Sequence, residues 1–149
     1  MNNRALSRRR VAGAILTLAA LPVSARAEEA PEITAAIRDL VGHARATVDG
    51  IALRLPTTAE NGGQVPVTVV VDSPQTAALH VTAIHILATR NPTPGVASFR
   101  LTPAIARAEV QTRIRLAEHQ RVIALAVMSD GSLRRAEGEV RVAVGGCLT

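Results

Sequence analysis

Short segments in which apolar and polar residues alternate make up most of the chain between residues 51 and 144. The segment with Val65, Val67, Val69 and Val71 is typical, and the turn-forming Asp72-Ser73-Pro74 ends it. A period of two predicts β-strands with one buried face. We expect strands at residues 51–55, 65–71, 79–88, 97–101, 108–116, 121–128 and 133–144. This spacing predicts an all-β fold, an immunoglobulin-like β-sandwich of about seven strands.

One short N-terminal helix is expected before the strands, between Pro31 and about Val41. Pro31 suits a first helical turn and Gly42 suits a helix end. The apolar residues fall on one stripe, which we expect to pack on a sheet: Ile33, Ala36, Ile37, Leu40 and Val41. The core of the domain must be aliphatic, because the chain has no Trp, no Tyr and a single Phe.

Residues 1–27 have the pattern of an export signal. Arg8, Arg9 and Arg10 precede an apolar run over residues 11–23, which is too short to span a bilayer. Ala25-Arg26-Ala27 is a small-x-small cleavage site. We interpret the segment as a twin-arginine signal peptide that needs Arg8 and Arg9 and is cut after Ala27. The mature protein is then expected in the periplasm, with no membrane segment.

The export signal also accounts for the excess of basic residues. The whole chain has 17 Lys and Arg against 12 Asp and Glu, for a formal net charge of +5. All of that excess lies within residues 1–27, which carry five arginines and no acidic residue. Nucleic-acid binding needs a surplus of cations and is commonly helped by aromatic stacking. The neutral, nearly aromatic-free domain is therefore not expected to bind nucleic acid.

Cys147 is the single cysteine of the sequence and directly follows Gly145 and Gly146. Glycine accepts almost any backbone angle, so residues 145–149 are expected to form a flexible arm, with an extended length of roughly 15 Å at about 3.3 Å per residue. One cysteine cannot form a disulfide within its chain, and no potential metal ligand stands beside it in the sequence. A buried thiol, an exposed carrier or reactive thiol and an intermolecular disulfide stay open, and the arm favours an exposed thiol.

Sequence patterns typical of enzymes are missing. The four histidines, His43, His80, His85 and His119, are scattered singly without metal-ligand spacing. The sequence has no glycine-rich phosphate loop, nucleophile elbow or paired-carboxylate motif. A general base cannot be held in register with a thiol on a mobile arm. We expect no metal, no cofactor and no catalysis by this chain alone.

Six segments occur in a recognisable order: 60–67 (ENGGQVPV), 71–74 (VDSP), 91–99 (NPTPGVASF), 112–117 (TRIRLA), 128–132 (MSDGS) and 145–147 (GGC). Together with the arginine signal in front and the cysteine near the end, this order resembles the SoxY family of thiosulfate-oxidation carrier proteins. The resemblance extends over nearly all of the predicted mature chain.

The resemblance implies an immunoglobulin-like sandwich over residues 28–144 and a C-terminal cysteine swinging arm over residues 145–149. It implies a heterodimer with a SoxZ-like subunit, in which thiosulfate-derived sulfur species are carried covalently on Cys147. Periplasmic Sox enzymes (SoxAX, SoxB and SoxCD-like) would act on them. Gly145 and Gly146 match the first half of the family's Gly-Gly-Cys-Gly-Gly arm, whereas Leu148 and Thr149 stand where the family has glycines.

One alternative from another functional class stays open. The chain could be a non-catalytic periplasmic binding or interaction domain, with Cys147 either incidental or joined to another protein by a disulfide. No feature of the sequence identifies the sulfur species that a carrier of this kind would load.

Overall fold

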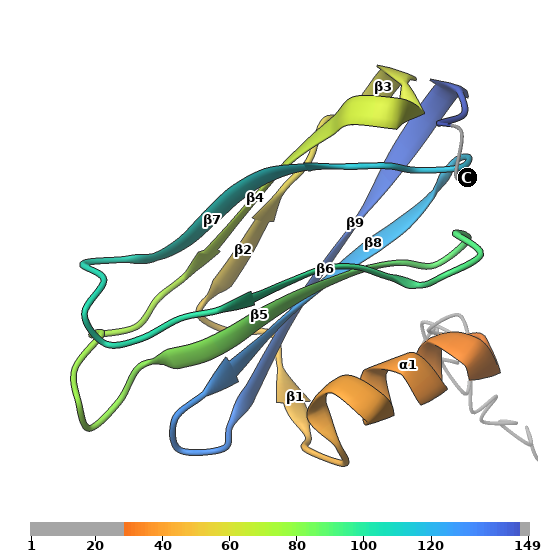
Figure 1. Cartoon of the computed structure of the whole chain (residues 1–149). Helices are drawn as coiled ribbons and strands as arrows, with labels where there is room; N and C mark the ends of the chain where they lie inside the picture. Colours follow the sequence, from red (N-terminus) through yellow and green to blue (C-terminus); the bar gives the residue numbers. More distant parts are fainter. Residues whose placement is uncertain (1–28, 147–149) are drawn as a thin grey trace, which may run out of the picture.

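The computed structural model describes residues 29–146 as a two-layered β-sandwich with one helix on its outside (Figure 1). The elements in chain order are α1 (Pro31–Val41), β1 (Ala46–Thr47), β2 (Ile51–Arg54), β3 (Thr58–Asn61), the 3₁₀-helix η1 (Gly62–Gln64), β4 (Val65–Val71), β5 (Val81–Ala88), β6 (Gly95–Arg100), β7 (Ala108–Ile114), β8 (Gln120–Met128) and β9 (Leu133–Val144). The larger sheet has the order β1–β9–β8–β5–β6, with β3 also paired to β9. The smaller sheet has the order β2–β4–β7.

The predicted immunoglobulin-like sandwich with a short N-terminal helix is confirmed, but residues 29–146 form nine strands where about seven were expected. The two additional strands are β1 and β3. β1 has two residues, and β3 buries Ala59 alone, so neither shows the alternation that marks a strand in the sequence. Both exist because they pair in parallel with β9, which lies far away in the sequence.

The core between the sheets is aliphatic, as predicted. Val65, Val67, Val69 and Val71 of β4 all point into it and are at most 4% exposed. β8 runs through the middle of the larger sheet, between β5 and β9, and its residues 122–126 are buried on both faces. The continuous apolar run of β8 therefore reflects its central position.

Helix α1 covers part of the outer face of the larger sheet. Its span matches the predicted helix, and Gly42 ends it with a positive φ of 69°. Ile33 is the one helix residue that is fully buried. It packs in a second apolar cluster with residues of β5, β8 and β9: Leu87, Ile123, Leu125 and Leu133.

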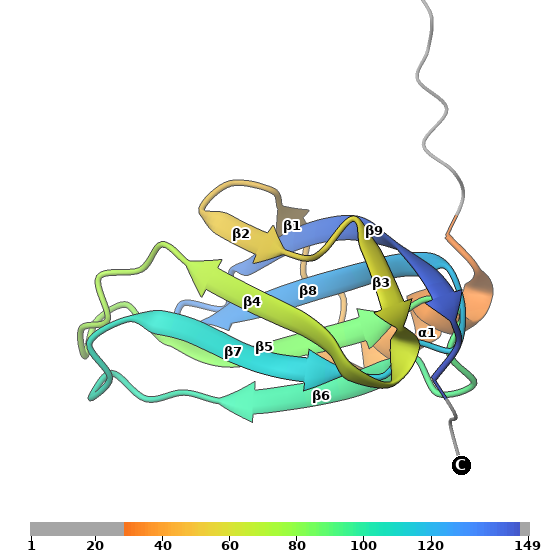
Figure 2. The same ribbon diagram turned by 90° about the horizontal axis from the view of Figure 1, so that it is seen from above.

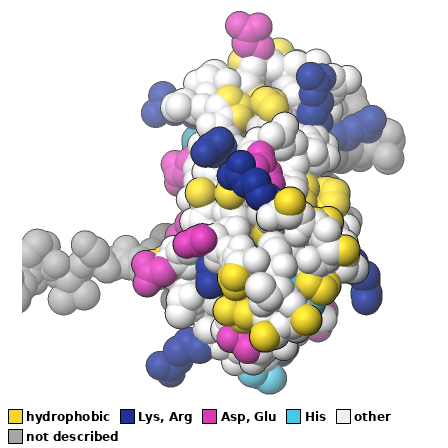
Figure 3. All heavy atoms as spheres, turned by 90° about the vertical axis from the view of Figure 1, so that its left-hand side faces the viewer, with side chains coloured by type: hydrophobic (Ala, Val, Ile, Leu, Met, Phe, Trp, Pro, Cys, Tyr) yellow, Lys and Arg dark blue, Asp and Glu magenta, His cyan; other side chains and the backbone are white. Residues whose placement is uncertain are grey.

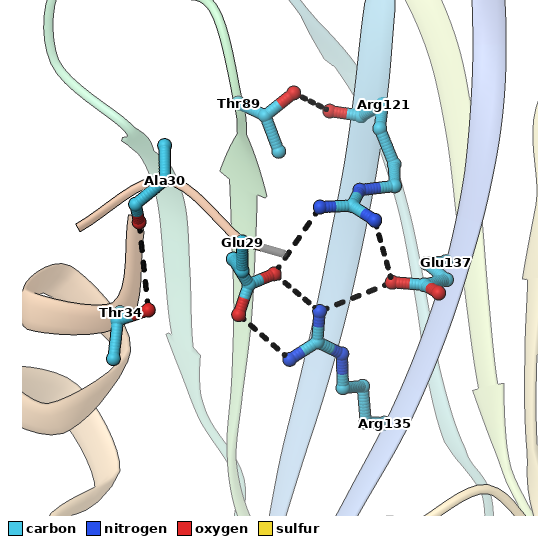
Figure 4. Close-up of polar contacts among 7 residues, drawn as sticks. All are labelled: Glu29, Ala30, Thr34, Thr89, Arg121, Arg135 and Glu137. Atoms are coloured by element: carbon cyan, nitrogen blue, oxygen red, sulfur yellow. Dashed lines mark hydrogen bonds and ion pairs between the residues drawn. The ribbon is translucent and has the colours of Figure 1, made fainter. Parts of the chain in front are cut away.

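An ion-pair network joins Glu29, two residues before α1, to the larger sheet (Figure 4). The guanidinium of Arg135 donates two hydrogen bonds to the Glu29 carboxylate and one to Glu137, and Arg121 donates to Glu29 at 3.3 Å. Burial disfavours the charged form of Arg135, but the hydrogen bonds to Glu29 and Glu137 outweigh this and raise its pKa. The network therefore holds the start of the described chain against β8 and β9.

The end of the sandwich that carries the β4–β5 and β6–β7 connections has a mixed surface. Small groups of hydrophobic side chains lie there between charged ones (Figure 3). Ile105, in the β6–β7 connection, is 36% exposed. Within residues 29–146, no helix is long and apolar enough to cross a membrane.

Replacing Ile33 tests the packing of α1. We expect Ile33→Ala to lower the free energy of unfolding by about 2–4 kcal/mol, because it leaves a cavity in the cluster under the helix. Leu40→Ala is the matched control on the same helix, since Leu40 is 37% exposed, and it should cost less than about 1 kcal/mol. Urea unfolding of the purified domain measures both, and equal losses would contradict the described packing.

Candidate functional site

The predicted site residues fall at the two ends of the chain. Arg8, Arg9 and Cys147 lie outside the described residues, whereas Gly145 and Gly146 lie within them. The two glycines directly follow β9. The structure therefore shows how the segment that leads to Cys147 leaves the sandwich.

The end of β9 runs beyond its neighbour in the larger sheet. Its pairing with β8 ends at Val140, opposite Gln120. From Arg141 to Val144, the strand that pairs with it in the described chain is β3 (Figure 2). The Arg141 amide also donates to the carbonyl oxygen of Thr57 at 3.0 Å. β3 thus sets the direction in which the chain approaches Gly145.

Gly145 and Gly146 stay in contact with the sandwich. The Gly146 amide donates a hydrogen bond to the carbonyl oxygen of Leu116, with an N···O distance of 2.9 Å. A Cβ atom on Gly145 would overlap the carbonyl oxygen of Ala117, and a Cβ on Gly146 would lie 2.8 Å from the carbonyl carbon and oxygen of Gly62. Both positions therefore require glycine for close approach of the backbone.

Gly62, the first residue of η1, forms the opposite side of this contact. It is buried, and its carbonyl oxygen accepts a hydrogen bond from the Leu116 amide at 2.8 Å. A Cβ on Gly62 would overlap the Leu116 carbonyl oxygen and lie 2.7 Å from the Gly146 nitrogen. The Asn61 side chain accepts a hydrogen bond from the Gly63 amide at 2.7 Å and so caps η1.

We name this arrangement the glycine slot: the backbone of Gly62, Leu116 and Ala117 around Gly145 and Gly146. It brings together the two Gly-Gly pairs of the sequence, 62–63 and 145–146. The slot lies at the end of the sandwich where β3, the β7–β8 connection and the end of β9 meet (Figure 1). Its lining is backbone and aliphatic, so it can position a chain segment but supplies no acid, base or metal ligand.

Two buried amide side chains hold the β7–β8 connection against the slot. Asn91 and Gln120 are 7% and 2% exposed. The Asn91 Oδ1 accepts hydrogen bonds from the Ala117 amide at 3.1 Å and from the Gln120 Nε2 at 2.9 Å, and its Nδ2 donates to the Arg115 carbonyl oxygen at 2.9 Å. An unpaired buried amide costs about 1–3 kcal/mol, so these bonds favour one loop conformation. Asn91 thereby fixes Ala117.

The histidines and acidic residues of the described range are dispersed over the sandwich. No group of three or more His, Cys, Asp or Glu residues in this range could hold a metal ion. His80 contacts the Thr76 carbonyl oxygen at 3.0 Å, and His85 contacts the Ser98 hydroxyl at 2.8 Å. Burial, helped by the positive charge of Arg100, lowers the pKa of His85. This shift favours the neutral imidazole, which links β5 to β6 through Ser98.

Comparison with known families bears directly on the end of the chain. The profile of the family described as sulfur oxidation protein SoxY matches residues 37–147. This range contains the sandwich, the glycine slot and Cys147. The chain belongs to the SoxY family. The family predicted from the ordered sequence motifs is thereby confirmed.

Solved structures agree with this membership. The sulfur carrier protein SoxY from Chlorobium limicola f thiosulfatophilum is 32% identical, with a TM-score of 0.63, and the match covers 76% of this chain and 97% of that one. A superoxide reductase (neelaredoxin) from Ignicoccus hospitalis is 18% identical, with a TM-score of 0.54 and coverage of 62% and 79%. The second likeness shows a shared fold alone. No match to a curated protein was found.

The structure of this SoxY-family chain adds to the predicted site. The sequence predicts that Gly145 and Gly146 belong to a flexible arm, whereas the structure places both in the glycine slot. The sequence pattern does not predict the residues that surround and support them: Gly62, Leu116, Ala117 and Asn91. The sequence contains one indication of their importance: these four residues lie within the segments 60–67, 91–99 and 112–117 that resemble the family.

Proposed function

We propose that this SoxY-family chain is a sulfur carrier that holds sulfur intermediates covalently on Cys147. Its family membership over residues 37–147, together with 32% identity to a solved sulfur carrier, is the observation that supports this role most strongly. The structure of residues 29–146 supports this role further, because the segment that leads to Cys147 leaves the sandwich through the glycine slot. The described sandwich therefore ends at Gly146, directly before the proposed carrier residue in the sequence.

The proposed chemistry needs a thiolate and an external enzyme. Attack by a thiolate is the general route by which cysteine forms bonds to sulfur. Joining the Cys147 sulfur to the outer sulfur of thiosulfate makes one S–S bond, releases the thiol proton and removes two electrons. A partner oxidoreductase must accept those electrons. We therefore assign loading and later oxidation or hydrolysis to periplasmic enzymes of the SoxAX, SoxB and SoxCD-like kinds.

Intact-mass measurement tests the carrier role. Protein purified from cells grown on thiosulfate is expected to show added mass corresponding to one sulfur–sulfonate group or to sulfur atoms. The addition should disappear in Cys147→Ser and after treatment with a thiol reductant. Unmodified protein in wild type, or a mass equal to a disulfide with another protein, would contradict the carrier role and favour a binding domain.

Association with a SoxZ-like subunit is the second part of the proposal. In the described chain, β6 and β7 each pair with one strand only, so each sheet has an open edge. Open edges in soluble proteins are normally covered or blocked. Co-expression with a SoxZ-like protein should therefore give a stable one-to-one heterodimer in size-exclusion chromatography with light scattering. Two separate monomers at micromolar concentration would contradict the proposed heterodimer.

Export to the periplasm is the third part. The Glu29 ion-pair network anchors the chain two residues after the predicted cleavage site, which fits a folded domain that begins there. Replacing both Arg8 and Arg9 by Lys should abolish recovery of the protein from the periplasm. Arg4→Lys is the control and should leave export unchanged. Export that survives the double replacement, or a mature N-terminus other than Glu28, would disprove the signal assignment.

A further inference from the structure

We propose that Gly62 is a positioning residue for the Cys147 thiol, because it closes the glycine slot that holds Gly145 and Gly146 on the sandwich. The pivot of the thiol then lies after Gly146 and not before Gly145. The functional meaning of this inference rests on the proposed carrier role. The placement itself does not, because it follows from contacts of described residues.

The first constraint on the position of the thiol is covalent. Cys147 is bonded to Gly146, so the Cα atoms of the two residues are about 3.8 Å apart whatever the conformation. Gly146 is itself held by the hydrogen bond from its amide to the Leu116 carbonyl oxygen, at 2.9 Å. While this bond is made, the starting point of the thiol is fixed relative to the sandwich.

The second constraint is steric and concerns the side chains that the slot can accept. Any side chain on Gly62 would overlap the Leu116 carbonyl oxygen and come within 2.7 Å of the Gly146 nitrogen. Any side chain on Gly145 would overlap the Ala117 carbonyl oxygen. The neighbours are backbone atoms, which cannot turn away as a flexible side chain can. The slot therefore accepts the chain only when both positions are glycine.

The third constraint is the rigidity of the two walls of the slot, which are formed by Gly62 and by Ala117. Gly62 follows β3, which is paired with β9, and the neighbouring Gly63 amide is capped by Asn61. On the other wall, Ala117 is held by the buried Asn91 side chain at 3.1 Å. Neither wall depends on the residues beyond Gly146. The slot is thus a fixed feature of the sandwich, and the chain end either occupies it or leaves it.

Occupancy of the slot determines how far the thiol can reach. With Gly146 bound, the arm beyond the fixed point begins at Cys147. When Gly145 and Gly146 leave the slot, two more residues join the arm and extend its reach by roughly 7 Å, at about 3.3 Å per residue. The slot therefore gives the carrier a short and a long state of one arm, which a partner enzyme can select by binding one of them.

A nitroxide spin label tests the inference, since the chain has one cysteine and the label attaches to Cys147 alone. Wild type should give a broadened spectrum of restricted motion, because the residue before the label is held. Gly145→Ala and Gly62→Ala should release the end and shorten the rotational correlation time several-fold. Gly95→Ala is the matched control, because a Cβ there has no neighbour within 4 Å, and its spectrum should match wild type.

The outcomes separate the slot from the carrier role. Gly62 is buried, so Gly62→Ala can prevent folding. In that case the spectrum of Gly145→Ala, near the chain end, tests whether the slot holds the chain. A wild-type spectrum as narrow as that of a folded Gly145→Ala variant would overturn the proposal, and so would equally broad spectra for both. The label requires no sulfur chemistry. A broad wild-type spectrum in a protein that forms no sulfur adduct would leave the slot intact and reject the carrier role.

Discussion

The backbone pairing of β9 with three other strands is the interaction on which the rest of the structure depends. β9 lies against β8 along one edge, and along its other edge it pairs first with β1 and then with β3. Buried backbone amides and carbonyls must find partners, so these short strands form where β9 offers an open edge. The same strand continues into the glycine slot. The fold and the placement of the chain end are therefore set by one element.

The glycine slot is sterically narrow but energetically weak. One backbone hydrogen bond, from Gly146 to Leu116, closes it, and such a bond contributes a net of about 1 kcal/mol. A partner that binds the released end about tenfold more tightly would offset that amount. This combination suits the proposed carrier role, in which the thiol is kept at one place between encounters and is still free to enter another protein.

Local patterns in the sequence predict much of the fold. The helix Pro31–Val41 and the buried face of β4 follow from the spacing of apolar residues. Asp130-Gly131 predicts the β8–β9 hairpin, where Gly131 has a φ of 82° and the Asp130 carboxylate accepts from the Ser132 amide. β3 and the glycine slot could not be predicted in this way. They depend on the register between residues 58–61 and 141–144 and on contacts of Gly62 with residues at the far end of the chain.

Hydrogen exchange of the Gly146 amide, followed by NMR on the wild-type protein, tests most directly whether the chain end is held. The account predicts exchange measurably slower than the intrinsic rate of an unstructured glycine amide, because Leu116 accepts its hydrogen bond. The Leu116 amide, which donates to Gly62, should be protected more strongly, since it lies in the wall of the slot. Exchange of the Gly146 amide at the intrinsic rate, with the Leu116 amide protected, would show an empty slot and contradict the account.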